Sequence, residues 1–207
     1  MTLPRRVILG AAIGTPTLAL RALAQANNAL EQPLRDLYDA LEKVMHAGRA
    51  VPFTQRFDIL APVIERVFDL ETVLKVSVGL RWDTLKPDTR SELLKVYRHF
   101  TIATYVANFD KYDGERFRIL PGTRDSGADR IVATEIITGA DHVRLDYVMR
   151  DAGRTWRIVD ILLDGSISRV AVQRSDFRKI LGNGDAGALI ASLRRKITDL
   201  SDGALNA

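Results

Sequence analysis

The amino-acid sequence predicts an α+β fold, in which N-terminal helices pack on a C-terminal antiparallel meander sheet. In the first half of the 207 residues, apolar side chains recur three or four positions apart, which is typical of helices that bury one face. In the second half the spacing changes to two, as in strands. No linker-like stretch lies between the halves, so we expect residues 25–207 to form a single domain.

Apolar spacing and end signals define the helical segments. Asp69 is a suitable N-cap for a helix that starts at Leu70, while Gly48 and Gly79 stand where helix C-termini favour glycine. A separate helical turn is expected to begin at Pro62, after the segment Phe53–Leu60. The other predicted helices are Asn27–Ala47, Leu70–Val78, Pro87–Phe109, Ser175–Gly182 and Asp185–Leu200.

The clearest strand signal is a hairpin between Tyr147 and Leu163, with its turn at Asp151–Arg154. The second run of this hairpin is apolar on both faces, so each face is either covered by other elements or borders an apolar cavity. Residues Pro121–Asp129 are expected to form turns. The other predicted strands are Arg116–Leu120, Ile131–Thr138, Val143–Arg150 and Ser168–Gln173, the last of which closes the sheet.

The first 24 residues are typical of an export signal. Arg5 and Arg6 precede an apolar run, and Ala22 and Ala24 form the small–x–small pattern of a cleavage site. The run is shorter than the roughly 20 apolar residues of a membrane span, and an uncleaved anchor is the alternative interpretation. The arginine pair also resembles a twin-arginine signal, which leaves this route and general secretion both open. We therefore expect a periplasmic protein.

Composition excludes several classes of function. Three of the 30 basic residues and none of the 26 acidic residues precede Ala24, so residues 25–207 carry 27 basic and 26 acidic side chains. No nucleic-acid partner is expected from that balance. The chain has no cysteine, which excludes disulfides and thiolate metal sites. His46, His99 and His142 lack metal-ligand spacing. We expect the protein to use no metal, cofactor or catalytic residue. We also expect it to be a monomer.

An ordered set of short motifs resembles a known family. The set ends with Tyr147, Trp156-x-Ile158-x-Asp160, Asp164-Gly165-Ser166-Ile167-Ser168 and Arg174-Ser175-Asp176-Phe177. Its earlier members are Phe57–Leu60, Phe68-Asp69, Gly79–Trp82, Tyr105 and Tyr112-x-Gly114. Together they resemble the MlaC-type, toluene-tolerance family of periplasmic lipid carriers, over roughly Leu34 to Leu200. The runs Leu60–Arg66 and Trp156–Gly165 are most similar to its hopanoid-biosynthesis-associated branch.

The resemblance implies an apolar cavity between sheet and helices, in which lipid chains are buried at roughly 0.8 kcal/mol per methylene while the headgroup stays outside. It further implies an auxiliary component of an ABC-type transport system. Membrane-bound complexes would load and unload a phospholipid or hopanoid carried between the inner and outer membranes. The residues expected to line the cavity are Val76, Leu80, Trp82, Phe100, Tyr105, Phe109, Val143, Leu145, Tyr147, Met149, Ile158 and Leu162.

Some of these interpretations have an alternative. Trp82 either guards the cavity mouth or anchors packing. Asp160 is expected to be tied to a turn or to an arginine such as Arg174, rather than to act as a base. A basic set either meets headgroups near the mouth or forms a solvated helix face; it comprises Arg81, Lys86, Arg90, Lys95 and Arg98.

Two other functions stay open at this point. An envelope adaptor would have an ordinary filled core and no ligand. An isomerase-like enzyme would need an aspartate, a tyrosine and often a histidine that converge in an apolar pocket.

Overall fold

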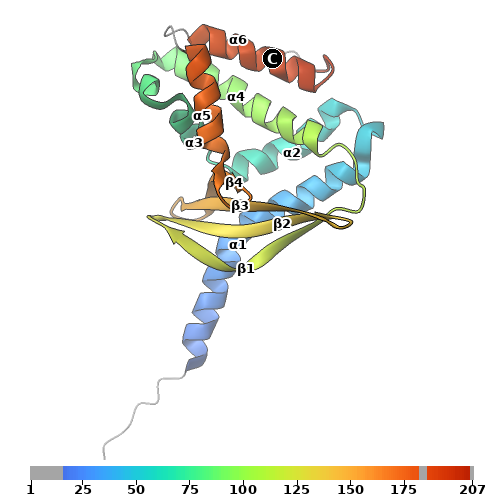
Figure 1. The fold of residues 1–207 in the computed structure, drawn as a ribbon, viewed down its shortest axis with the longest axis vertical. Helices are drawn as coiled ribbons and strands as arrows, with labels where there is room; N and C mark the ends of the chain where they lie inside the picture. Colours follow the sequence, from blue (N-terminus) through green and yellow to red (C-terminus); the bar gives the residue numbers. More distant parts are fainter. Residues whose placement is uncertain (1–15, 182–185, 206–207) are drawn as a thin grey trace, which may run out of the picture.

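The computed structural model describes residues 16–181 and 186–205 (Figure 1). The predicted export signal therefore lies mostly outside the described residues, as do Gly182 and Asp185, and cleavage after Ala24 stays a prediction. The helices are α1 (Pro16–Ala47), α2 (Phe53–Val67), α3 (Leu70–Val78), α4 (Pro87–Asn108), α5 (Arg169–Ile180) and α6 (Ala186–Leu200). Two short 3-10 segments, η1 (Gly48–Ala50) and η2 (Gly79–Thr84), follow α1 and α3.

Five antiparallel strands form one sheet in chain order, which confirms the predicted α+β class and its meander. The strands are β1 (Arg116–Ser126), β2 (Asp129–Thr138), β3 (Asp141–Asp151), β4 (Trp156–Leu163) and β5 (Ile167–Ser168). Figure 1 shows α2 to α6 gathered on one side of this sheet, while the N-terminal part of α1 projects beyond it. The inner face of the sheet is thus the face that meets the helices.

The ends of α3 lie where the sequence predicts them. The Asp69 carboxylate accepts a hydrogen bond from the Thr72 backbone N–H at 3.0 Å and so caps the helix. Gly79 follows the helix at φ 70°, a conformation that glycine adopts without steric cost. A Cβ at Gly79 would lie 3.3 Å from Nε of Arg174. The glycine therefore also permits the close packing of α3 against α5.

The predicted break at Pro62 is wrong. Helix α2 continues through this proline from Phe53 to Val67. A proline in a helix interior removes one backbone hydrogen bond. Leu60 and Ile64, on either side of Pro62, are fully buried. Burial of this face holds the helix together across the missing bond.

The predicted turns at residues 121–129 are largely strand. Strand β1 continues to Ser126 through an irregularity, because Ile119 pairs with Thr134 whereas Thr123 pairs with Val132. The residues between Ile119 and Thr123 include Pro121, which has no N–H, and Gly122 at φ 88°. A bulge accommodates both without ending the strand.

The predicted closing strand Ser168–Gln173 is also wrong. Only Ile167 and Ser168 pair with β4, and α5 begins at Arg169. The Ser168 hydroxyl accepts a hydrogen bond from the Ala171 N–H at 2.9 Å. An N-cap of this kind ends the extended backbone and starts a helix.

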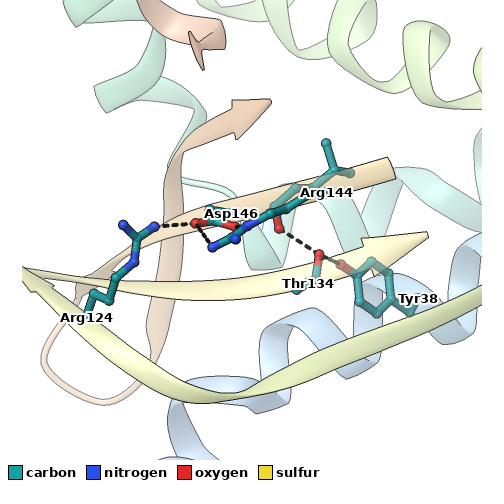
Figure 2. A network of polar contacts seen from close by, with 6 residues as sticks. Tyr38, Arg124, Thr134, Arg144 and Asp146 are labelled. Carbon is teal, nitrogen blue, oxygen red and sulfur yellow. Dashed lines mark hydrogen bonds and ion pairs between the residues drawn. The ribbon is translucent and has the colours of Figure 1, made fainter. Parts of the chain in front are cut away.

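The outer face of the sheet carries charged side chains, and one of its acids is fully buried. Asp146 has no exposed surface and lies between Arg124 of β1 and Arg144 of β3 (Figure 2). Nε of Arg144 donates to Oδ1 of Asp146 at 2.8 Å. The two arginine side chains are about half exposed, so they cover the carboxylate while their own charges stay hydrated.

One cluster of buried apolar side chains connects α1 and α2 to the inner sheet face. Leu37 and Leu41 of α1 and Ile64 of α2 belong to it, together with Met149 and Ile158 of the sheet. A single bridge between Phe68 and Ile158 joins the end of α2 to β4. These contacts fix the helical layer on one end of the sheet; the other end borders the cavity.

Candidate functional site

A cavity of about 530 Å³ lies between the inner face of β3 and β4, helix α4 and helix α5. Its volume falls within the range of roughly 300–1,000 Å³ in which proteins hold small molecules. The lining is formed by Phe68, Leu70, Val73, Tyr97, Phe100, Thr101, Thr104, Tyr105, Asn108, Phe109, Leu145, Tyr147, Asp160, Ile161, Leu163, Arg169, Val170, Val172, Gln173, Asp176, Phe177 and Lys196.

The sheet wall of the cavity consists of two cross-strand pairs. Leu145 pairs with Leu163, and Tyr147 pairs with Ile161, so all four side chains share the inner face. The wall is held from the neighbouring strand β2, because the Thr134 hydroxyl donates to the carbonyl of Leu145 at 2.8 Å. This part of the lining is apolar apart from the tyrosine hydroxyl.

The helix wall is aromatic. The ring centroids of Tyr105 and Phe109, one turn apart on α4, lie 5.9 Å from each other and the rings are nearly parallel. The ring of Phe68, at the end of α2, lies 5.7 Å from Tyr105. Such rings provide a large apolar surface of fixed shape. A flexible hydrocarbon chain placed against them would lose its contact with water.

The tyrosines of the cavity are held in their neutral form. Burial raises the pKa of Tyr97 to about 12, and it raises the pKa of Tyr105 and Tyr147 above the ordinary value as well. The Tyr97 hydroxyl donates to the side-chain oxygen of Gln173 at 3.0 Å. The Tyr38 hydroxyl, behind Tyr147, donates to Thr134 at 2.7 Å. These groups therefore keep their protons at neutral pH, and their hydroxyls give the apolar lining a small number of neutral polar positions.

The Asp160 carboxylate has the structural role that the sequence predicts, with different partners. It accepts hydrogen bonds from the Ser168 hydroxyl at 2.5 Å and from the backbone N–H groups of Ile161 at 2.7 Å and Val170 at 3.1 Å. The guanidinium of Arg174 packs next to Gly79 instead. Three donors leave this carboxylate little capacity to act as a base.

Five of the predicted lining residues line the cavity: Phe100, Tyr105, Phe109, Leu145 and Tyr147. The other seven lie elsewhere. Trp82 is buried under Arg90, whose guanidinium is 5.9 Å from the ring, which favours the packing role. Leu80 is 90% exposed. Val76 and Val143 are also exposed, Met149 and Ile158 are buried beside the cavity, and Leu162 faces the outer side with Asp146.

Ile161 and Leu163 are the apolar lining residues that sequence reasoning missed on β4, and Asp160 also lines the cavity. Strict alternation from Ile158 predicts that Leu162 shares its face. The register shifts, however, because Met149 pairs with Ile158 whereas the preceding Val148 pairs with Asp160. This bulge at Val159 turns Ile161 and Leu163 inward. Nothing in the local sequence marks the bulge, although the pairing of Tyr147 and Leu145 requires it.

The mouth of the cavity is polar and lies away from the predicted basic set around η2 and early α4. Among the lining residues, the exposed ones are Asn108 of α4, Arg169, Val172 and Asp176 of α5, and Lys196 of α6. Of the predicted basic set, none lines the cavity formed by the described residues. Arg90 donates instead to the carbonyls of Leu85 and Asp83, at 2.9 and 2.8 Å. The exposed part of the lining, which we call the mouth, therefore comes mainly from α5, with one residue each from α4 and α6.

Within the described part of the chain, no cluster of three or more histidine, aspartate or glutamate side chains is arranged to hold a metal ion. Across residues 16–181 and 186–205, no helix has both the length and the apolar character that a bilayer crossing requires.

Comparisons with known proteins agree with this geometry. A search of curated proteins finds no match. Among solved structures, a phospholipid-binding protein from Ralstonia solanacearum, in complex with a phospholipid, superposes with a TM-score of 0.72 at 17% identity. The likeness covers 84% of this chain and 98% of that one, and at this identity it shows a shared fold. The model of the MlaC protein family matches residues 35–195, and the chain therefore belongs to the MlaC family.

Proposed function

We propose that this protein is a periplasmic lipid carrier that stores the hydrocarbon chains of a phospholipid in the cavity between sheet and helices. The observation that supports this most directly is the lining. Leu145, Ile161 and Leu163 face the aromatic rings of Tyr105 and Phe109 across an open volume of about 530 Å³. A chain that enters this volume gains roughly 0.8 kcal/mol for each methylene removed from water.

Membership in the MlaC family and the phospholipid bound by the Ralstonia solanacearum protein support the same ligand class. A hopanoid is the alternative cargo. The proposal includes export by an N-terminal signal, action as a monomer, and exchange of lipid with membrane-bound complexes between the inner and outer membranes. The proposed storage involves no covalent chemistry: the chains are held by burial alone.

Native mass spectrometry with lipid extraction tests this proposal. The protein is purified after export, and its intact mass is measured before and after delipidation. We expect one lipid per chain, which extraction identifies as a phospholipid or a hopanoid. An apo mass that persists when lipid vesicles are added would contradict the carrier function. It would favour the adaptor, which has no ligand.

A further inference from the structure

Two cations at the cavity mouth have no acidic partner among residues 16–181 and 186–205. Arg169 begins α5 and Lys196 lies on α6, and both line the cavity with exposed side chains. Among the described residues, no carboxylate forms an ion pair with either of them. The ammonium of Lys196 lies 5.8 Å from the ring centroid of Phe100, which is itself part of the lining. This position keeps the charge over the opening.

The two acids of the lining have other partners and form no ion pair with these cations. Asp160 is occupied by Ser168 and by two backbone N–H groups. Asp176 pairs with Lys179 at 3.0 Å, and Lys179 is not part of the lining. The mouth is thus left with two positive charges that are available to a ligand. The interior beside them offers an apolar wall and neutral hydroxyls.

From this arrangement we infer that the carried lipid has an anionic headgroup, whose phosphate is held at the mouth by Arg169 and Lys196. This inference rests on the proposed carrier function. A chain buried between the sheet and α4 leaves its polar end at the opening, where α5 and α6 present the two cations. Guanidinium and ammonium groups form charge-assisted hydrogen bonds with phosphate oxygens. A headgroup without charge gains no electrostatic attraction from the two cations. In a headgroup that also carries an amine, the positive charge of the amine offsets part of the attraction of its phosphate.

The test compares lipids that differ only in the headgroup. Delipidated protein is incubated with phosphatidylcholine vesicles that contain the same mole fraction of phosphatidylglycerol, phosphatidylethanolamine or diacylglycerol, all with identical acyl chains, and uptake of each added lipid is measured by native mass spectrometry. Since one exposed ion pair contributes up to about five-fold, we expect roughly ten-fold more phosphatidylglycerol than diacylglycerol. Phosphatidylethanolamine should fall between them. The preference should decrease at high salt, because exposed charges are screened.

Two double variants separate the effect of Arg169 and Lys196 from the effect of the protein's net charge. The double variant Arg169→Gln with Lys196→Gln should take up all three lipids at similar levels. The control is Arg178→Gln with Arg195→Gln, which removes the same charge from exposed positions of α5 and α6 outside the lining. This control should keep the wild-type preference. An unchanged preference in the first double variant, or an equal loss in both, would overturn the inference.

Two further outcomes distinguish the headgroup inference from the carrier function on which it rests and from a binding site for free anions. If the wild type takes up none of the three lipids, the carrier function itself fails. Uptake of all three without preference overturns only the headgroup assignment. Inorganic phosphate should neither bind nor compete, since it has no chain to anchor it. Phosphate binding that depends on Arg169 and Lys196, together with no lipid preference, would assign a free-anion site and overturn the lipid assignment.

Discussion

The Asp160 carboxylate and the Ser168 hydroxyl are joined by a hydrogen bond of 2.5 Å, which connects the cavity wall in β4 to the first turn of α5. The other oxygen of Asp160 accepts from the Ile161 and Val170 N–H groups. Two walls of the cavity are therefore positioned by one side chain. The geometry of the mouth, which α5 contributes, depends on the same contact.

Replacement of Asp160 by alanine should lower the free energy of unfolding by about 1–3 kcal/mol, because backbone and hydroxyl donors lose their acceptor. Asp176→Ala is the matched control. Asp176 also lines the cavity, but its ion pair with Lys179 is exposed, so its loss should cost less than about 1 kcal/mol. Urea denaturation followed by circular dichroism measures both. Equal losses would show that Asp160 does not hold the two elements together.

Leu145→Trp should reduce lipid uptake several-fold without destabilising the protein. The larger side chain extends into open space, so it avoids the roughly 1–3 kcal/mol that overpacking costs in a filled core. Val143→Trp is the control, since Val143 has the same strand parity but is exposed and does not line the cavity. The measurement is lipid stoichiometry by native mass spectrometry. Wild-type uptake by Leu145→Trp would place the lipid elsewhere.

Stability should decrease at alkaline pH through Tyr97. Burial disfavours the tyrosinate, so the folded-state pKa is about 12 against 10.0 for the ordinary side chain. The stabilisation is fully present below pH 10.0 and is lost as pH rises through about 12. The shift corresponds to about 3 kcal/mol.

Tyr97→Phe should lose about 1 kcal/mol at neutral pH, through its hydrogen bond to Gln173, yet show a smaller alkaline decrease. Tyr38, whose pKa is also about 12, would account for part of the decrease that remains. Urea denaturation at a series of pH values measures both effects. An alkaline decrease as steep as that of the wild type would assign the effect to other groups.

Gly165→Ala should destabilise the protein more than Gly153→Ala. Both glycines have positive φ, 71° and 88°, so each alanine carries a backbone cost of about 1–2 kcal/mol. Only at Gly165 would the new Cβ also meet neighbours, at 3.2 Å from Nε of Arg144 and 3.3 Å from Oδ2 of Asp146. Thermal unfolding of the two variants isolates this second effect. Similar melting temperatures would mean that the arginine moves aside at little cost.

The sequence predicts the helices best where a local signal marks their ends. Asp69 and Gly79 bound α3 through a cap and a positive φ, both of which depend on residue type alone. Pro62 misleads, because burial of one helix face outweighs its missing hydrogen bond. Residues 169–173 are predicted as strand but belong to α5, because Ser168 both ends the pairing with β4 and caps the helix through the Ala171 N–H. Its hydrogen bond to Asp160, eight residues away, cannot be read from the local sequence.

The cavity was predicted only in part for a similar reason. The α4 aromatics and the alternating residues of β3 lie on faces that periodicity identifies, and Phe100, Tyr105 and Leu145 line the cavity. The bulge at Val159 depends on pairing with β3. The sequence of β4 alone therefore does not reveal which of its residues face the cavity. The cations at the mouth come from α5 and α6, whose placement over the opening is a property of the tertiary fold.

The hydrogen bond from Tyr97 to Gln173 crosses from α4 to α5, and both residues border the cavity. Separation of these helices breaks it, at about 0.5–1.5 kcal/mol. A hydrogen bond of that strength opens by thermal motion alone, so this contact by itself does not hold α4 and α5 together. In the proposed lipid carrier, the Tyr97–Gln173 contact would therefore not be what limits the opening of the cavity between these two helices.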